Sequence, residues 1–566
     1  MRPIAPTPII LAVLLVLGSV TPATAGASLP DTAPASFRAQ VAALDSVAEA
    51  ALAPVDAPRL LAEADAAEPF SGPVLFAEAQ ATSYGLDAGT WETLADGSRL
   101  WRLRLSSPGA TSLNLRFGRF ELPEGAELWF YDPARTTVQG PYGRSQRNPE
   151  GELWTAMVSG DEAVVELLLP AAVAQAPVEL EISSVQRGFR PVGAAFTKQG
   201  SCNNDVICPE GDPYRDQIRA VAWYSVNGIG LCSGTLMNNT AVDFTPYFLT
   251  ADHCRVGSGN AGSMVVYWNF ESPTCGQLSG GSLADNQSGA LFRAGDEGSD
   301  FTLVELLEMP SADFHVYYAG WDATTSVPTG VVGIHHPNLD EKAISFDDDL
   351  LLIEDSSYWR VGAWNDGTTE PGSSGSCLFR QDTKRCIGTL TGGFASCSEP
   401  GEYDVYGRMS AHWDGPNKAS RLRDWLDPTA SGLLAMAGAD PASGGEQPGP
   451  CVADAQTACL NQGRFAVSII WRDFEDNTGV GTVVPGASDD SALFWFFKAA
   501  NWEVLVKVLR ACGVNQRYWV LGAAATNVEY TITVTDHVTG QTETYDNPLG
   551  RRAPAIADTN SFAVCP

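Results

Sequence analysis

The first clear pattern along the chain is an alternation of apolar and polar residues between residues 100 and 117. In LWRLRLSS, apolar side chains occupy every second position from Trp101 to Leu105, and in SLNLRFGRF they do so from Leu113 to Phe117. A period of two predicts β-strands with one buried face. Because the turn sequences LPEG and YDP follow these runs, we expect a small antiparallel β-domain that ends near residues 182–185.

The rest of the chain continues this pattern of strands and turns. Residues 199–437 alternate short apolar runs with turn residues and end in NKASRLRDWLD, which predicts a helix stopped by Pro428. Residues 438–450 are rich in Gly, Pro and Ser, which indicates a linker. In the tail, residues 451–566, apolar positions alternate with polar ones from Val528 to Val534. We therefore expect an all-β protein whose central domain lies between an N-terminal β-rich domain and a C-terminal β-sandwich-like domain.

The N-terminus has the features of a secretion signal. Arg2 precedes an apolar run from about Ile9 to Val20, and Ala23-Thr24-Ala25 has the small residues of a cleavage site. This run is too short to span a bilayer, and an uncleaved membrane anchor is the alternative. We expect residues 1–25 to be a signal peptide and the protein to be secreted to the extracellular medium.

Charge and cysteine content narrow the classes of function. The formal net charge of −32 disfavours nucleic acid and anionic membranes as partners and favours cationic substrates. Twelve cysteines, none before residue 202, occur in a chain expected to be exported, so disulfides are expected rather than zinc sites. Adjacent His335 and His336 would point to opposite faces of a strand, so we expect them to share no metal ion. We expect no metal, no cofactor and a monomer.

The segment TEPGSSGSC, residues 369–377, places three serines between glycines, which by itself is typical of a flexible loop. A serine becomes a nucleophile when a histidine removes its proton and a carboxylate orients that histidine. His253, in YFLTADHCR, follows an apolar strand, and Asp300, in EGSDFTLVEL, precedes another. Each is an ordinary structural position when taken alone. Together with Ser374, they form a candidate catalytic triad.

Two features near these residues support that hypothesis. Gly372 and Gly375 flank the serine pair and allow a sharp turn, so the N–H groups of Gly372 and Ser374 can form an oxyanion hole. Cys254, beside the histidine, has Cys232 as a candidate disulfide partner. The sequence GSSGS differs from the G-x-S-x-G turn of α/β-hydrolases.

Several motifs between about residues 201 and 431 resemble those of bacterial lysyl endopeptidases, which are secreted serine proteases with the double β-barrel of chymotrypsin. In chain order they are CSGTLMNNTAVDFTPYFLTADHC, SDFTLVEL, GIHHPNLDEKAIS, TEPGSSGS and YDVYGR. The resemblance implies that Ser374 is the nucleophile, His253 the general base and then acid, and Asp300 the carboxylate that orients the histidine.

The resemblance also implies a set of disulfides. The family's three bridges carry over to Cys202–Cys397, Cys208–Cys275 and Cys232–Cys254. Cys377 and Cys386 lie outside that pattern. They bracket LFRQDTKR, an expected hairpin, so we predict a fourth bridge between them.

A pocket for a basic residue follows from the same resemblance. Asp404 in EYDVYGR matches the carboxylate that pairs with a substrate lysine, and a surface turn is its alternative role. Thr391, Gly392 and Gly393 match the pocket edge, where substrate backbone adds as a strand. The type members have a His in place of Thr391, which leaves the choice between Lys and Arg open. They also have a His in place of Asp252, which either acts on the neighbouring His253 or faces solvent. We expect protein or peptide substrates with Lys or Arg at the cleaved position.

The junction AAFTKQGSCNND resembles the start of the family's mature enzymes, which follows a Lys a few residues before the first Cys. The resemblance implies self-cleavage between Lys198 and Gln199. Residues 26–198 would then be a propeptide, a partner that shields the site until folding ends. The alternative is a binding module that stays attached.

Other functions fit parts of the sequence. An inactive protease fold that binds partners through its terminal β-domains would be favoured by a missing triad residue, and none is missing. A preference for acidic residues is disfavoured by an aspartate at the pocket floor. In the C-terminal domain, four tryptophans are candidates for a ligand surface or for core packing, and four cysteines can pair with one another. These are Trp471, Trp495, Trp502 and Trp519, and Cys451, Cys459, Cys512 and Cys565.

Overall fold

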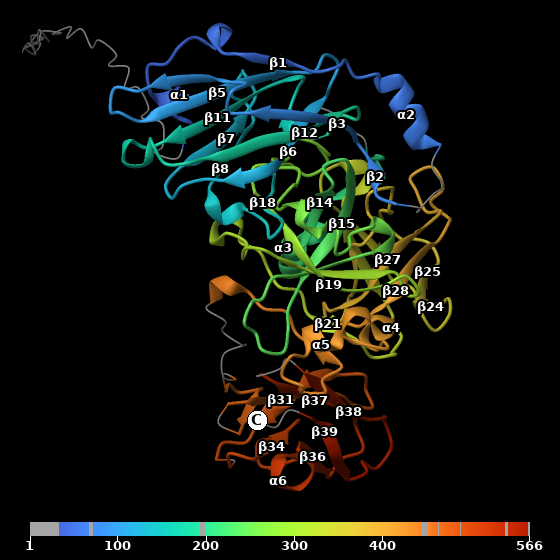
Figure 1. Cartoon of the computed structure of the whole chain (residues 1–566). Coiled ribbons are helices and arrows are strands. Elements are labelled where there is room, and N and C mark those ends of the chain that lie inside the picture. The colour runs from blue at the N-terminus through green and yellow to red at the C-terminus, as the bar shows by residue number, and fades with distance from the viewer. Residues whose placement is uncertain are drawn as a thin grey trace, which may run out of the picture.

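A computed structural model describes residues 33–66, 72–192, 199–443, 451, 453–461, 463–486, 488–537 and 541–563. Three β-rich regions follow one another in space as they do in the chain, with the central region between the two others (Figure 1). The prediction of an all-β fold is confirmed. The predicted signal segment and Lys198 lie outside the described residues. Within those residues, no helix has the length and apolar character needed to cross a membrane.

The N-terminal region is a sandwich of two sheets. One has the order β1-β5-β11-β7-β8 with β4 beside β5, and the other has the order β10-β6-β12-β3 with β9 beside β6. The alternating residues of the sequence, such as Leu103 and Leu115, are fully buried between the sheets. Two short helices, α1 (Ala35–Arg38) and α2 (Ala57–Asp65), accompany them. The strands are β1 (Glu49–Ala51), β3 (Ala77–Gly85), β4 (Thr90–Thr93), β5 (Arg99–Ser106), β6 (Ser112–Glu121), β7 (Glu127–Tyr131), β8 (Val138–Tyr142), β9 (Leu153–Trp154), β10 (Val158–Ser159), β11 (Glu162–Leu169) and β12 (Glu179–Gly188).

The central region contains two sheets, one for each barrel of the double β-barrel that the sequence predicts. The first has the order β18-β17-β14-β15-β16-β20-β19, and the second has the order β13-β23-β22-β26-β27-β28-β25-β24, with β21 and β29 joined to it. The first set is β14 (Val221–Val226), β15 (Gly230–Met237), β16 (Tyr247–Thr250), β17 (Val265–Tyr267), β18 (Asn286–Ser288), β19 (Ala290–Asp296) and β20 (Phe301–Leu306). The second is β13 (Asn204–Asp205), β21 (Trp321–Asp322), β22 (Val331–His335), β23 (Ala343–Asp347), β24 (Leu352–Ile353), β25 (Tyr358–Val361), β26 (Cys377–Arg380), β27 (Cys386–Gly393), β28 (Asp404–Arg408) and β29 (Ala435–Met436).

The N-terminal region and the first barrel share a strand pairing and an apolar cluster. Strand β2 (Val74–Leu75) pairs antiparallel with β15, so the N-terminal region adds a strand to the sheet of the first barrel. Next to it, Phe76 is fully buried in a cluster that joins N-terminal residues such as Trp154 to barrel residues such as Trp223. The amide of Asn114 also donates to the carbonyl of Gly228 at 3.2 Å. This interface therefore combines backbone pairing with apolar burial.

The predicted helix near Pro428 is only partly formed. The structure has a 3₁₀ turn at Lys418–Ser420 and a four-residue helix, α5 (Arg423–Leu426), instead of one continuous helix. Arg421 between them is extended, and the following Leu422 is fully buried. Two other short helices, α3 (Arg215–Ala220) and α4 (Met409–Trp413), belong to this region. Beyond them, the start of the predicted linker is bound to the central region, because Ala439 exchanges backbone hydrogen bonds with Tyr318.

The C-terminal region is a second sandwich, with sheets ordered β30-β31-β37-β38, with β32 beside β31, and β33-β34-β35-β36-β39. Cys451 and Cys459 are disulfide-bonded. Of the four tryptophans singled out in the sequence, Trp502 is 54% exposed and Trp471 stacks on Phe496. The elements are β30 (Ala458–Leu460), β31 (Phe465–Arg472), β32 (Thr478–Val480), β33 (Thr482–Val483), β34 (Ser491–Trp495), β35 (Val504–Ala511), α6 (Cys512–Asn515), β36 (Arg517–Ala524), β37 (Glu529–Asp536), β38 (Thr542–Asn547) and β39 (Ile556–Phe562).

Candidate active site

His253 and Asp300 are hydrogen-bonded to each other. His253 lies in a 3₁₀ turn after β16, and Asp300 directly precedes β20, which pairs with β16. The imidazole Nδ1 is 2.9 Å from Asp300 Oδ2, and the backbone N–H of His253 donates to Asp300 Oδ1 at 2.9 Å. The carboxylate therefore fixes both the ring and the backbone of the histidine.

The charge state of Asp300 follows from these contacts. The side chain is almost fully buried, and burial opposes its ionisation. The hydrogen bonds and the charge of His253 outweigh that effect and hold the pKa of Asp300 below its ordinary value. An ionised carboxylate accepts the Nδ1 proton, so the lone pair of the imidazole is on Nε2. In the described part of the protein, Nε2 is buried and has no hydrogen-bond partner.

The serine loop packs against the segment that leads to His253. Gly375 has a φ of +83°, and a Cβ there would stand 2.2 Å from Thr250 Oγ1 and 2.8 Å from the backbone nitrogen of Ala251. Only glycine fits this conformation and this approach. The carbonyl of Ser374 accepts from the N–H of Ser233 on β15, and it lies 3.9 Å from the Sγ of Cys254. The loop is thus anchored beside the histidine, although no hydrogen bond joins the Ser374 hydroxyl to Nε2.

The backbone N–H groups of the loop divide into two sets. Those of Ser373, Gly375 and Ser376 donate to the carbonyls of Glu370, Leu390 and Ser373, respectively. Those of Gly372 and Ser374 donate to no group in the residues that the structure describes. The two free donors are the ones predicted for the oxyanion hole.

Asp404, the first residue of β28, is 1% exposed and holds its two carboxylate oxygens in different settings. Oδ2 accepts from the indole N–H of Trp364 at 2.7 Å and from the Thr369 hydroxyl at 2.7 Å. Oδ1 is buried and accepts no hydrogen bond from the described residues. Burial raises the pKa of Asp404 to about 6, against the opposing effect of Thr369, Trp364 and the backbone N–H of Ala395. An ionised carboxylate oxygen that is buried without a partner is costly, and a cation placed beside it would offset that cost.

The other predicted pocket residues lie on β27 beside Asp404. Gly393 is the strand partner of Asp404, and a Cβ on it would stand 2.3 Å from Asp404 Oδ1. A side chain at this position would therefore cover the free oxygen. Gly392 follows a register shift in β27. The Thr391 hydroxyl is buried and helps to lower the pKa of Asp300, the carboxylate that contacts His253.

Asp252, which stands where the type members have a His, is not a second partner for the imidazole. It is about half buried, and its pKa is raised by that burial and by the neighbouring carboxylates Asp300, Glu297 and Asp296. The attraction of His253 opposes this rise but does not outweigh it.

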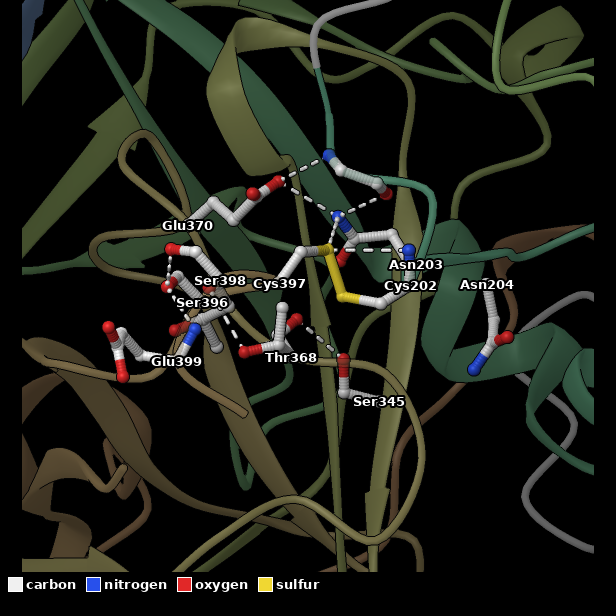
Figure 2. The surroundings of a disulfide bond; sticks show 12 residues. Cys202, Asn203, Asn204, Ser345, Thr368, Glu370, Ser396, Cys397, Ser398 and Glu399 are labelled. Carbon is white, nitrogen blue, oxygen red and sulfur yellow. Dashed lines mark hydrogen bonds between the residues drawn. A yellow bond between two sulfur atoms is a disulfide. The ribbon is translucent and has the colours of Figure 1, made fainter. Parts of the chain in front are cut away.

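The four disulfides expected in the central region are present. They are Cys202–Cys397, Cys208–Cys275, Cys232–Cys254 and Cys377–Cys386. Figure 2 shows the surroundings of the first one, where Glu370 accepts hydrogen bonds from the Gly200 N–H and from the Asn203 amide. Gln199, which precedes Gly200, is buried, and its backbone N–H donates to a carboxylate oxygen of Asp340 at 3.1 Å. The chain beyond the predicted cleavage site is thus held beside the serine loop.

The sequence did not identify the two donors to Asp404. Thr369 opens the motif TEPGSSGS, so its position in that motif was the available signal. Trp364 and Trp359 both precede the serine loop, and the sequence does not choose between them, because the approach of Trp364 to Asp404 depends on the pairing of β25 with β28.

Two protein-family models match parts of this chain. The pattern described as "Lysyl endopeptidase, C-terminal domain" matches residues 196–407, and that described as "Lysyl endopeptidase N-terminal domain" matches residues 72–186. A lysyl endopeptidase of Pseudomonas aeruginosa is 27% identical over 345 residues, which cover 55% of this chain and 72% of that protein.

Solved structures that share similarity include two proteases. A Glu endopeptidase in complex with MPD is 16% identical, with a TM-score of 0.26, and the match covers 36% of this chain and 90% of that one. Neuropsin, a serine protease of mouse brain, is 13% identical, with a TM-score of 0.27, and the match covers 37% of this chain and 95% of that one.

Proposed function

The chain belongs to the lysyl endopeptidase family and is a serine endopeptidase, and we propose that it cleaves peptide bonds after lysine through Ser374, His253 and Asp300. The observation that carries the proposal is the bond between His253 Nδ1 and Asp300 Oδ2, which leaves Nε2 as a base beside the serine loop. A serine hydroxyl needs such a base to attack an amide.

In the proposed reaction, Ser374 Oγ attacks the substrate carbonyl while His253 Nε2 takes the hydroxyl proton. The imidazolium is stabilised by Asp300 and then protonates the leaving amine, and water releases the acyl group by the same steps. The N–H groups of Gly372 and Ser374 stabilise the oxyanion, a role supported by their lack of other acceptors. The hydroxyl must meet Nε2 in the substrate complex, and hydrogen bonds of this kind are often open in the free enzyme.

Lysine is proposed over arginine because of the two settings of Asp404. Arginine pairs best with both oxygens of a carboxylate, whereas the lysine ammonium is a point charge that needs only one. Trp364 and Thr369 already occupy Oδ2, so Oδ1 alone is free for the substrate. Gly393 has no side chain to crowd that buried oxygen, and Thr391, Gly392 and Gly393 would hold the substrate backbone.

We also propose that the protein is made as a secreted precursor. Residues 1–25 would be removed on export, and the enzyme would cut its own chain between Lys198 and Gln199. Residues 26–198 would act as the propeptide, with 438–450 and 451–566 as a linker and an accessory domain. The proposal is supported by the basic residue at position 198 and by the apolar cluster around Phe76 and Trp223, which gives the propeptide a docking site.

The test is hydrolysis by the Ser374→Ala protein. We expect kcat to fall by roughly a millionfold, as when a triad serine is removed, and a fluorophosphonate to label the parent protein at Ser374 alone. Ser376→Ala is the matched control, because this serine is fully buried in the same loop and its hydroxyl has no described partner. Sizeable hydrolysis by purified Ser374→Ala would reject the triad. A digest of a mixed peptide library that shows no preference for lysine would reject the pocket assignment.

A further inference from the structure

Residues 368–374 connect the two halves of the proposed site. Near one end, the hydroxyl of Thr369 holds Asp404. At the other end, Ser373 precedes the proposed nucleophile. If this segment shifted, the distance between the lysine-binding carboxylate and Ser374 would change, and catalysis is sensitive to displacements of this kind.

Both ends of residues 368–374 are linked through hydrogen bonds to the imidazole of His335. His335, the last residue of β22, is fully buried, and its Nδ1 lies 2.9 Å from the hydroxyl of Ser373. Its Nε2 lies 3.1 Å from the hydroxyl of Ser345 on β23. Ser345 in turn donates to the carbonyl of Thr368 at 2.7 Å, a bond drawn in Figure 2.

The donors and acceptors of this chain fit a single tautomer. The Ser345 hydroxyl gives its proton to Thr368, so it accepts from His335 Nε2–H. Nδ1 then has a lone pair and accepts the hydroxyl proton of Ser373, whose oxygen also accepts from the Glu370 N–H at 3.3 Å. Burial lowers the pKa of His335 to about 3, so the ring stays neutral and keeps this tautomer.

We propose that His335 is a positioning residue that fixes the serine loop relative to the wall of the lysine pocket, through Ser373 on one side and Ser345 with Thr368 on the other. This inference rests on the proposed function, because it assigns Ser374 and Asp404 the roles given there. His335 touches no reacting atom and acts through Ser373. Its neighbour His336 serves elsewhere, since that ring stacks on Phe270 and its Nδ1 contacts the carbonyl of Asp340.

The test uses serine-to-alanine changes, which remove one hydroxyl each and leave the histidine in place. In the full chain, Ser373→Ala and Ser345→Ala should each slow fluorophosphonate labelling of Ser374 by roughly five- to tenfold, the effect of one net hydrogen bond. The double variant should be no slower than the slower single variant, because both changes break the same chain. Ser376→Ala, in the same loop without a described partner, should label at the parent rate.

A readout independent of turnover accompanies the labelling. Amide hydrogen exchange of residues 372–376 should speed up in Ser345→Ala, which lies on another strand, and not in Ser376→Ala. Labelling of Ser345→Ala at the parent rate, additive effects in the double variant, or equal slowing in Ser376→Ala would each overturn the proposal. If the parent protein neither labels nor hydrolyses, the proposed function fails, and the exchange measurement still decides whether His335 couples the two segments.

Discussion

The indole N–H of Trp364 donates to Asp404 Oδ2 at 2.7 Å, across 40 residues of chain. Together with Thr369, it occupies one oxygen of a carboxylate whose other oxygen has no described partner. The structure thus divides the carboxylate into a fixed side and a free side. The proposed preference for lysine rests on this division.

Replacing the Trp364 indole should weaken the proposed preference for lysine over arginine. Trp364→Phe keeps an aromatic ring but frees a lone pair on Oδ2, so an arginine fork gains a second acceptor. We expect the ratio of kcat/KM for lysine over arginine substrates to fall by roughly five- to tenfold, the size of one hydrogen bond. Trp359→Phe is the control, since Trp359 is also buried but donates to the carbonyl of Ile387. An unchanged ratio in Trp364→Phe, or the same fall in Trp359→Phe, contradicts this account.

In the protein without bound substrate, the ionised form of Asp404 should lower the free energy of unfolding. Its pKa of about 6 in the folded state lies above the value of 3.8 of a free aspartate, so the folded state favours the protonated form. The free energy of unfolding that the protonated carboxyl contributes is therefore fully present below pH 3.8. It is lost as the pH rises from 3.8 to about 6, and it stays lost at higher pH. Asp404→Asn should stabilise the protein at pH 8 by on the order of 2–3 kcal/mol and have little effect near pH 4. Thermal unfolding at both pH values checks this, and equal shifts at the two values would refute it.

The affinity for a lysine mimic should rise with pH, whereas the stability of the empty protein should fall. The ammonium of butylamine needs the ionised form of Asp404, which is lost as the pH falls through about 6. In Ser374→Ala, where no turnover interferes, we expect affinity to drop by up to about tenfold for each pH unit below that point. Calorimetry from pH 8 to pH 4.5 measures it. Affinity that is constant over this range would show that another group binds the ammonium.

The sequence predicted the elements whose signal is local. The alternation in residues 100–117 and 528–534 corresponds to β5, β6 and β37, because side chains of a strand alternate between its faces. The motifs predicted that His253 and Asp300 meet, and the two side chains are hydrogen-bonded.

What the sequence did not predict depends on pairings between distant segments. Trp364 reaches Asp404 only because β25 pairs with β28, and His335 reaches Ser373 because β22 lies beside β26. The two-residue strand β2 is too short to show an alternation, yet it joins the N-terminal region to β15. The helix predicted before Pro428 is divided because burial of Leu422 outweighs local helix propensity.

The packing of Phe76 leads to a prediction about the N-terminal region after cleavage. Phe76 is fully buried against the first barrel and its N–H donates to the carbonyl of Ile229, so cutting the chain at Lys198 breaks none of these contacts. We expect the two fragments to co-elute in size-exclusion chromatography. Phe76→Asp should separate them, since loss of such a buried ring costs about 3–5 kcal/mol. Leu75→Asp, next to it and 39% exposed, should not. Separate elution of the parent fragments would show that burial at Phe76 is too weak to hold them together.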